Sequence, residues 1–229
     1  MNKIFISLFI TIVAYSSINA QLYFSFSEKV INADFSVFRP MAKRGFSDMN
    51  EGIFQVQPGI KFIKNRWAFT SHYAFFISND QNKIKNKKAS LHGQGFSIGT
   101  QYHLTNWGSF KLSPALEIGI RKYNLDYIET VTKIDPFTFR TTSKDITVFS
   151  FNGLGLYSDI GLNMEKIYPI KKRAFGIGFG VGYRLDYGTW QLSDPIPINN
   201  ANAYHNGTYI NIHLLFALQK ISKRSRRSP

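Results

Sequence analysis

The sequence predicts an all-β chain that closes into an antiparallel, up-and-down transmembrane barrel of eight strands, with ten strands as the alternative count. Three observations predict this fold. Large apolar residues alternate with small or polar ones in segment after segment. One of these segments carries glycine at four successive alternate positions. No stretch after the N-terminal twenty residues approaches the roughly 18 uninterrupted apolar residues of a membrane-spanning helix.

The glycine segment, residues 175–187, shows which face of a strand meets which surroundings. Its odd positions are large and apolar, and its even positions are Gly176, Gly178, Gly180, Gly182, Arg184 and Asp186. Alternate residues of a strand point to opposite faces. Glycine weakens a strand unless another group must approach its backbone closely. The crowded inside of a narrow barrel is such a place, so we expect the glycines inside and the large residues against lipid.

The N-terminal twenty residues predict export. Lys3 precedes an apolar run from Ile4 to Tyr15, and small residues lead to Ala20. This pattern is typical of a secretory signal peptide. We therefore expect residues 1–20 to be a signal peptide, residues 21–221 to be the barrel domain and residues 222–229 to be a basic periplasmic tail.

Eight alternating segments account for the strands. The first is expected over 30–38, with Ile31 facing outward, while 22–27 is left open as an extra strand or a tether. The later segments lie near 54–62, 67–77, 95–104, 110–121, 148–162, 175–187 and 208–220. Lys64-Asn65 joins two of them in the way of a hairpin.

The connections are predicted to alternate in length. Short ones are expected near Lys64, Thr105 and Asn163, and long ones over 41–51, 78–91, 122–145 and 188–207. Short periplasmic turns and long outer loops alternate in this way in bacterial outer-membrane barrels. Trp67, Trp107 and Trp190 fall near strand ends, where interfacial aromatic residues anchor a barrel.

These features resemble those of the small outer-membrane β-barrels of Gram-negative bacteria, the porin-family or OmpA/OmpX-like barrel domain. The resemblance rests on the signal sequence, the two-residue alternation, the Phe175-Gly-Ile-Gly-Phe-Gly-Val-Gly-Tyr run and the rhythm of loop lengths. It implies location in the cell outer membrane and assembly by the outer-membrane insertion machinery. One departure is that Phe216 is followed by further residues and a basic tail, whereas such barrels usually end on an aromatic residue.

The inside of an eight-stranded barrel is just wide enough to be filled by its own side chains. Charged residues on the inward positions are therefore expected to pair with one another and plug the lumen. The expected set is Asp34, Lys61, Glu117, Arg121, Asp159, Arg184 and Asp186. A narrow or gated ion path is the alternative that the same charges leave open.

The formal net charge is +14, from 28 Lys and Arg against 14 Asp and Glu, and a chain so basic requires an acidic partner. In an outer membrane this favours lipopolysaccharide over nucleic acid. The candidate contacts are Lys83, Lys85, Lys87 and Lys88 in the second outer loop. With no cysteine, the chain has neither disulfides nor thiolate ligands.

An enzymatic alternative stays open because some eight-stranded barrels deacylate lipid A with a Ser-His pair on the lipid-facing wall. Ser90 and His92 come closest to such a pair, in the reverse of the usual order and without an assigned carboxylate. We predict no catalytic, cofactor or metal site. We expect a monomer with a structural or surface-interaction role through its outer loops; a lipid A hydrolase, a narrow channel and an accessory barrel of a secretion system are the alternatives.

Overall fold

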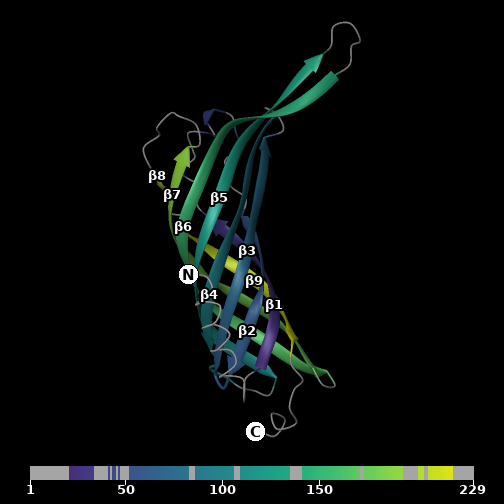
Figure 1. Ribbon diagram of the computed structural model, residues 1–229, viewed down its shortest axis with the longest axis vertical. Helices are drawn as coiled ribbons and strands as arrows, with labels where there is room; N and C mark the ends of the chain where they lie inside the picture. The colour runs from purple at the N-terminus through teal and green to yellow at the C-terminus, as the bar shows by residue number, and fades with distance from the viewer. Residues whose placement is uncertain are drawn as a thin grey trace, which may run out of the picture.

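The computed structural model describes residues 21–33, 41, 43–44, 46, 52–82, 86–105, 109–134, 141–170, 173–192, 201–203 and 206–218. Almost all of these residues are in β-strands, which confirms the all-β class (Figure 1). The signal segment 1–20 and the tail 222–229 lie outside the described residues. Within the described ranges, no helix has the length and hydropathy needed to cross a membrane.

Nine strands follow one another along the described part of the chain. They are β1 (Gln21–Ala33), β2 (Ile53–Lys64), β3 (Trp67–Asn82), β4 (Lys87–Tyr102), β5 (Phe110–Ile134), β6 (Thr141–Ile170), β7 (Arg173–Leu192), β8 (Ala201–Ala203) and β9 (Gly207–Ala217).

Eight of these strands form a closed ring. Antiparallel pairing runs from β1 through β7 in order and continues from β7 to β9. The ring closes where β9 pairs with β1, from Tyr23 opposite Ala217 to Ala33 opposite Gly207. The three-residue β8 only adds to the end of β7. The described residues therefore confirm eight strands in the ring, and the alternative of ten is wrong.

Burial alternates along the strands as the sequence predicts. In β2, Gln55, Gln57 and Lys61 are buried inside the ring, while Phe54 and Ile60 are exposed on the outside. The other exposed large apolar residues on the outer surface include Phe69, Phe75, Ile98, Ile118, Leu156, Ile177, Val181 and Ile212. The two-residue connection Asn65–Arg66 is confirmed as a hairpin turn, with Asn65 at a φ of 55°, a left-handed conformation that asparagine tolerates well.

The glycines of β7 face inward, as predicted, and they make room for side chains of neighbouring strands. A Cβ atom on Gly182 would lie 2.5 Å from the Tyr209 ring and against the carbonyl oxygen of Ile160. Val181, the preceding residue, is exposed on the outside. Glycine is therefore needed at position 182 because a ring from β9 occupies the space beside its backbone.

The predicted first strand is wrong in its start and in its facing, and its residues 34–38 lie outside the described residues. Strand β1 begins at Gln21 and so includes the segment that was left open as a tether. Ile31 is fully buried, whereas Val30 is half exposed. Tyr23, Ser25, Ser27 and Lys29 are all buried, so the odd residues face inward. The sequence analysis assigned the opposite facing because the residues after Val30 are apolar at odd positions. A one-residue change of parity moves every side chain of a strand to the other face.

The predicted turn near Asn163 is also wrong. Asn163 is a buried residue inside β6, and its backbone is paired with Gly180 of β7. The chain turns instead between Ile170 and Arg173. The alternation of inward Asn163 and Glu165 with outward Met164 continues the pattern of the strand, so the polar residues here mark the inner face rather than a turn.

Two of the predicted long loops are mostly strand. Strand β3 extends to Asn82 and β4 begins at Lys87. Strands β5 and β6 continue as a hairpin to Ile134 and Thr141, well past the last partner of β5 in β4, which pairs Glu129 with Lys87. Figure 1 shows this hairpin projecting beyond the rest of the ring. Residues 141–148 of the hairpin are all exposed.

We predict that Gly182→Val lowers the free energy of unfolding by about 1 to 3 kcal/mol, the usual cost of overpacking a filled interior. The measurement is the urea midpoint of the refolded protein in detergent micelles. Val181→Leu changes the neighbouring outward residue and serves as the control, with a midpoint close to that of the wild type. Equal losses in the two variants would contradict the inward position of the glycine.

Candidate functional site

The inside of the ring is crossed by ion pairs between opposite strands. In β1, the Lys29 ammonium lies 2.9 Å from Glu117 of β5 and 2.8 Å from Asp159 of β6. Strands β1 and β5 have three strands between them in either direction around the ring, so they are diametrically opposite. The Lys29–Glu117 pair therefore spans the full width of the lumen.

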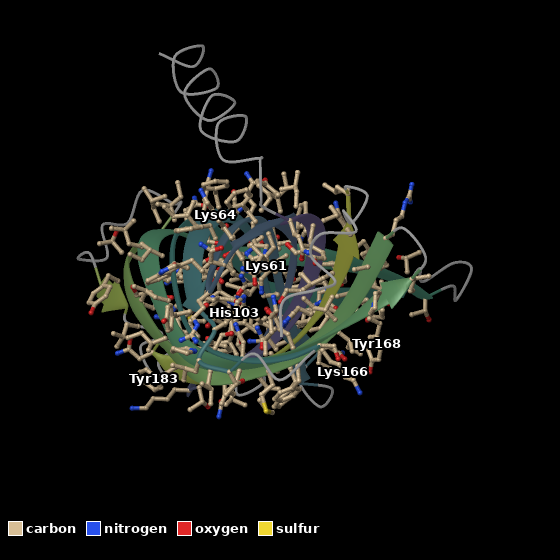
Figure 2. All side chains as sticks on the ribbon, turned by 90° about the horizontal axis from the view of Figure 1, so that it is seen from below. Lys61, Lys64, His103, Lys166, Tyr168 and Tyr183 are labelled. Carbon is tan, nitrogen blue, oxygen red and sulfur yellow. The ribbon has the colours of Figure 1, made fainter. Side chains whose placement is uncertain are left out.

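A second pair spans the lumen between β2 and β6, which are also opposite in the ring. Lys61 donates to Glu165 and, at 2.6 Å, to Gln101 Oε1. His213 Nε2 lies 2.9 Å from the same carboxylate oxygen of Glu165. Figure 2, a view along the barrel, shows Lys61 inside the ring and Tyr183, Lys166 and Tyr168 outside it. These contacts join β2, β4, β6 and β9 at one level of the lumen.

Two arginines form further ion pairs inside the ring. Arg184 binds Asp159 through two hydrogen bonds of 2.6 and 2.7 Å, the bidentate geometry that arginine and carboxylate favour. Arg121 pairs with Asp186 of β7. Each guanidinium also lies over a ring, Arg184 over Tyr157 at 4.0 Å and Arg121 over Tyr123 at 4.1 Å. Each guanidinium is thus in contact with both a carboxylate and an aromatic ring.

Six of the seven residues named as a lumen network from the sequence lie at these contacts: Lys61, Glu117, Arg121, Asp159, Arg184 and Asp186. Asp34 lies outside the described residues. Sequence reasoning missed Lys29 and Glu165. The alternation of Ser25 and Ser27 with phenylalanines could have identified Lys29 as an inward residue. Glu165 was missed because the sequence analysis placed a turn at Asn163.

The ion pairs that cross or line the lumen contain equal numbers of cations and carboxylates. Four cations, Lys29, Lys61, Arg121 and Arg184, face four carboxylates, Glu117, Asp159, Glu165 and Asp186. Isolated buried charges are costly, and paired ones lose part of that cost through attraction and hydrogen bonding. These eight ionised groups therefore carry no net charge when the histidines are neutral.

A small polar cavity of about 40 Å³ lies among these residues. Its lining includes Lys29, Lys61, Glu117, Asp159 and Glu165. One buried water needs about 10 to 15 Å³ of such space, so the cavity has room for roughly three waters. This volume suits bound water rather than the passage of a solute.

Toward the end of the ring that carries the β5–β6 hairpin, the interior becomes apolar. Phe76, Leu91, Leu125 and Tyr127 are fully buried there. Phe46, from the connection between β1 and β2, packs edge to face on Tyr127 at 5.2 Å and is itself buried. Met41 belongs to the same apolar cluster. This connection therefore contributes side chains to the interior at its hairpin end.

The outer wall changes character at that same level. Away from the hairpin, the outer surface carries the exposed apolar residues described under the overall fold, which we name the belt. Toward the hairpin, the outward residues of β3 to β6 are polar. We name this polar set the wall patch: Asn79, Ser90, His92, Gln94, Lys122, Asn124, Asp126, Ser150 and Asn152. Apolar residues inside and polar residues outside are typical of a sheet in water, so the apolar outer surface ends at the wall patch.

Among the predicted aromatic anchors, Trp67 is about half exposed beside the β2–β3 turn and packs on Tyr102 at 4.9 Å. Trp107 and the side chain of Trp190 lie outside the described part of the structure. The anchoring role stays a prediction.

The lysines predicted to contact lipid are placed differently from expectation. Lys83 and Lys85 are outside the described residues, and Lys87 and Lys88 lie on strand β4 rather than in a loop. Lys88 donates to Asp145 at 2.5 Å, which holds the pKa of that exposed carboxyl below its usual value. The Lys87 ammonium lies over the Phe46 ring at 4.8 Å and donates to the Arg44 carbonyl. Both lysines thus have partners within the chain.

The Ser90 and His92 side chains do not form a nucleophile–base pair in this structure. Ser90 donates to Asn79 Oδ1 at 2.7 Å. The His92 ring contacts Asn124 at 3.2 Å, and its Nδ1 atom lies 4.0 Å from Asp126. Asp126 in turn accepts a hydrogen bond from Ser150 at 2.6 Å. A carboxylate is near the imidazole, but the serine hydroxyl is directed to a different strand.

Within the described ranges, no group of three or more histidine and carboxylate side chains is placed to hold a metal ion.

Comparison with known proteins finds no matching family model and no curated sequence relative. The solved structures with a similar fold include the following three. Neisserial surface protein A has 13% identity and a TM-score of 0.42 over 89% of this chain and 99% of its own. A major outer membrane protein from Thermus thermophilus has 10% identity and a TM-score of 0.46 over 86% and 98%. The outer membrane protease OmpT from Escherichia coli has 8% identity and a TM-score of 0.32 over 87% and 94%.

We predict that Lys61→Met and Glu165→Gln, made singly, each lower the free energy of unfolding by about 3 to 5 kcal/mol, because each leaves a buried charge without its partner. The double variant should lose much less than the sum. Urea unfolding in micelles, followed by intrinsic fluorescence, gives the three values. Strictly additive losses would contradict a direct pair across the lumen.

Proposed function

We propose that the protein is an outer-membrane β-barrel with a plugged lumen, which acts as a structural or surface-interaction component through the connections at its hairpin end. One observation carries this proposal: two ion pairs, Lys29–Glu117 and Lys61–Glu165, cross the lumen of a ring whose outer surface is apolar. The ion pairs oppose a conducting path, and the belt favours lipid around the ring.

The outer belt supports the membrane placement. Large apolar side chains are exposed on every strand of the ring, among them Phe69, Ile118, Leu156, Ile177 and Ile212. A water-soluble monomer rarely exposes a continuous apolar surface of this extent. In lipid, a closed ring also satisfies the backbone groups that an open sheet edge would leave unpaired. Both features suit a hydrocarbon environment.

The filled interior supports a role other than diffusion of solutes. The charged level with its cavity of about 40 Å³ and the apolar level above it lie in series along the lumen. A solute would have to displace both the ion pairs that cross the lumen and the buried apolar residues around Phe46. We therefore assign the working surface to the outside of the molecule, where loops on a rigid scaffold commonly carry binding functions.

The proposed partners are lipids of the outer membrane, lipopolysaccharide among them, and the machinery that inserts outer-membrane barrels. The proposal is non-enzymatic, because Ser90 binds Asn79 instead of the His92 ring. If this is correct, lipid A from cells with and without the protein has the same acyl chains by mass spectrometry. Loss of an acyl chain that returns with His92→Ala would favour the hydrolase instead.

Placement in the membrane has a sharp test in two matched isoleucines. Ile118 is 52% exposed on the belt, and Ile146 is 46% exposed on the projecting hairpin. We expect Ile118→Lys to lower the free energy of unfolding in lipid vesicles by about 2 to 4 kcal/mol, the cost of a lysine near the bilayer midplane. Ile146→Lys should change it little. Equal effects at the two positions, or a chain that stays folded and monodisperse without detergent, would contradict the membrane placement.

The plugged lumen predicts that the purified protein gives no steady current in a planar lipid bilayer. The ion pairs of Lys29 and Lys61 oppose ion passage because any ion must separate them. Insertion is checked in the same preparation by protease protection of the ring. Steady porin-sized conductance from inserted protein would overturn this part of the proposal.

A further inference from the structure

A groove of about 410 Å³ lies on the outer wall across strands β3, β4 and β5. Phe75 and Ile77 of β3 form one part of its lining, and His92, Gln94, Lys122 and Asn124 form the other. Residues of the three strands are direct neighbours in the sheet, since Ile77 is opposite His92 and Gln94 is opposite Lys122. The groove is therefore a continuous surface feature with an apolar part and a polar part.

The groove lies at the level where the wall changes from apolar to polar. Phe75 and Ile77 are the last large apolar residues on the outer face of β3, and Asn79 follows them. On β5, Ile120 precedes Lys122. If the belt meets hydrocarbon, the polar half of the groove lies at the depth of lipid headgroups and the apolar half at the depth of the first acyl carbons.

Lys122 supplies the charge. Its side chain is accessible, and none of the ion pairs among the described residues includes it. Lys88, by contrast, is neutralised by Asp145. His92 is 54% exposed beside Lys122, and the Asn124 and Gln94 amides lie in the same lining. These groups give one ammonium and several further donors.

One carboxylate lies nearby. Asp126, one outward position above Asn124, accepts from Ser150 at 2.6 Å and lies 4.0 Å from the His92 ring. Its charge therefore acts mainly on His92 and Ser150, and it is not among the residues that line the groove. The Lys122 end of the groove keeps its positive charge.

We propose that this groove binds the phosphate-bearing headgroup of an outer-leaflet lipid, with Lys122 and His92 at the phosphate and the upper acyl carbons against Phe75 and Ile77. A phosphate offers several acceptor oxygens for such donors. A soluble anion would use only the polar half, whereas an amphiphile uses both halves. The inference rests on the proposed membrane placement and names a lipid site different from the lysines of the second loop.

The test uses the full-length mature protein in detergent micelles and native mass spectrometry with three probes: diphosphorylated lipid A, the same lipid without phosphates, and inorganic phosphate. We expect the wild type to bind the diphosphorylated lipid at least tenfold more tightly than the dephosphorylated lipid. The double variant Lys122→Gln with His92→Gln should lose this preference. Lys64→Gln, an exposed lysine at the opposite end of the ring, should keep it.

The apolar half has its own variant. Ile77→Ser should weaken binding of the diphosphorylated lipid while leaving any binding of inorganic phosphate unchanged. Unchanged lipid binding in the Lys122 and His92 double variant would overturn the proposal, and so would equal affinity for inorganic phosphate. Each variant is first checked for the heat-dependent shift in gel mobility of a folded barrel, so that loss of folding is not taken for loss of binding.

The outcomes also separate this inference from the proposed function. If the wild type fails to insert into vesicles, the membrane placement itself fails. If it inserts and the groove variants bind lipid like the wild type, only the groove assignment fails.

Discussion

The pairing of β1 with β9 closes the sheet, and the rest of the structure depends on that closure. Eleven residue pairs from Tyr23–Ala217 to Ala33–Gly207 join the first and last strands of the ring. Each antiparallel pair satisfies backbone donors and acceptors that an open edge would leave without partners. In hydrocarbon such unpaired groups cost several kcal/mol each, so closure is the condition under which an apolar outer surface is compatible with a polar backbone.

Closure also fixes what the interior must contain. Eight strands leave a space that side chains fill, and the alternation of every strand sends half of its residues there. The chain fills the space in two ways. At one level, four cations and four carboxylates meet across the ring, and glycines in β7 admit the Tyr209 and His213 side chains. At the hairpin end, aromatic and aliphatic residues fill the interior, and the outer face becomes polar.

Much of this could be predicted from the sequence. The two-residue alternation predicted the strands and faces of β2, β3, β7 and β9, because an apolar outer surface and a filled polar lumen require different side chains at successive residues. The predicted up-and-down order of eight strands already implies that β2 and β6 lie opposite each other. The sequence could not reveal the stagger of the strands around the ring, which decides that Lys61 and Glu165 meet at the same height.

The errors arose where local patterns were ambiguous. In β1, the apolar residues lie at even positions up to Val30 and at odd positions from Ile31 onward, and the facing is decided by pairing with β2 and β9. The extensions of β5 and β6 have the composition of loops, rich in threonine and lysine, and they become strands because each supplies the other with a partner. The wall patch and its groove were not foreseen either, since they combine residues from separate strands.

The projecting hairpin has an unpaired strand edge that affects how two copies of the barrel can meet. Within the described ranges, residues 141–150 of β6 pair only with β5, so their other edge presents free amide and carbonyl groups. Such an edge is a template for pairing with a like edge. Lys133 and Lys144 stand on this ribbon, and like charges repel over about 8 Å at physiological ionic strength. The two lysines therefore oppose pairing between like edges of two copies, and added salt weakens this repulsion.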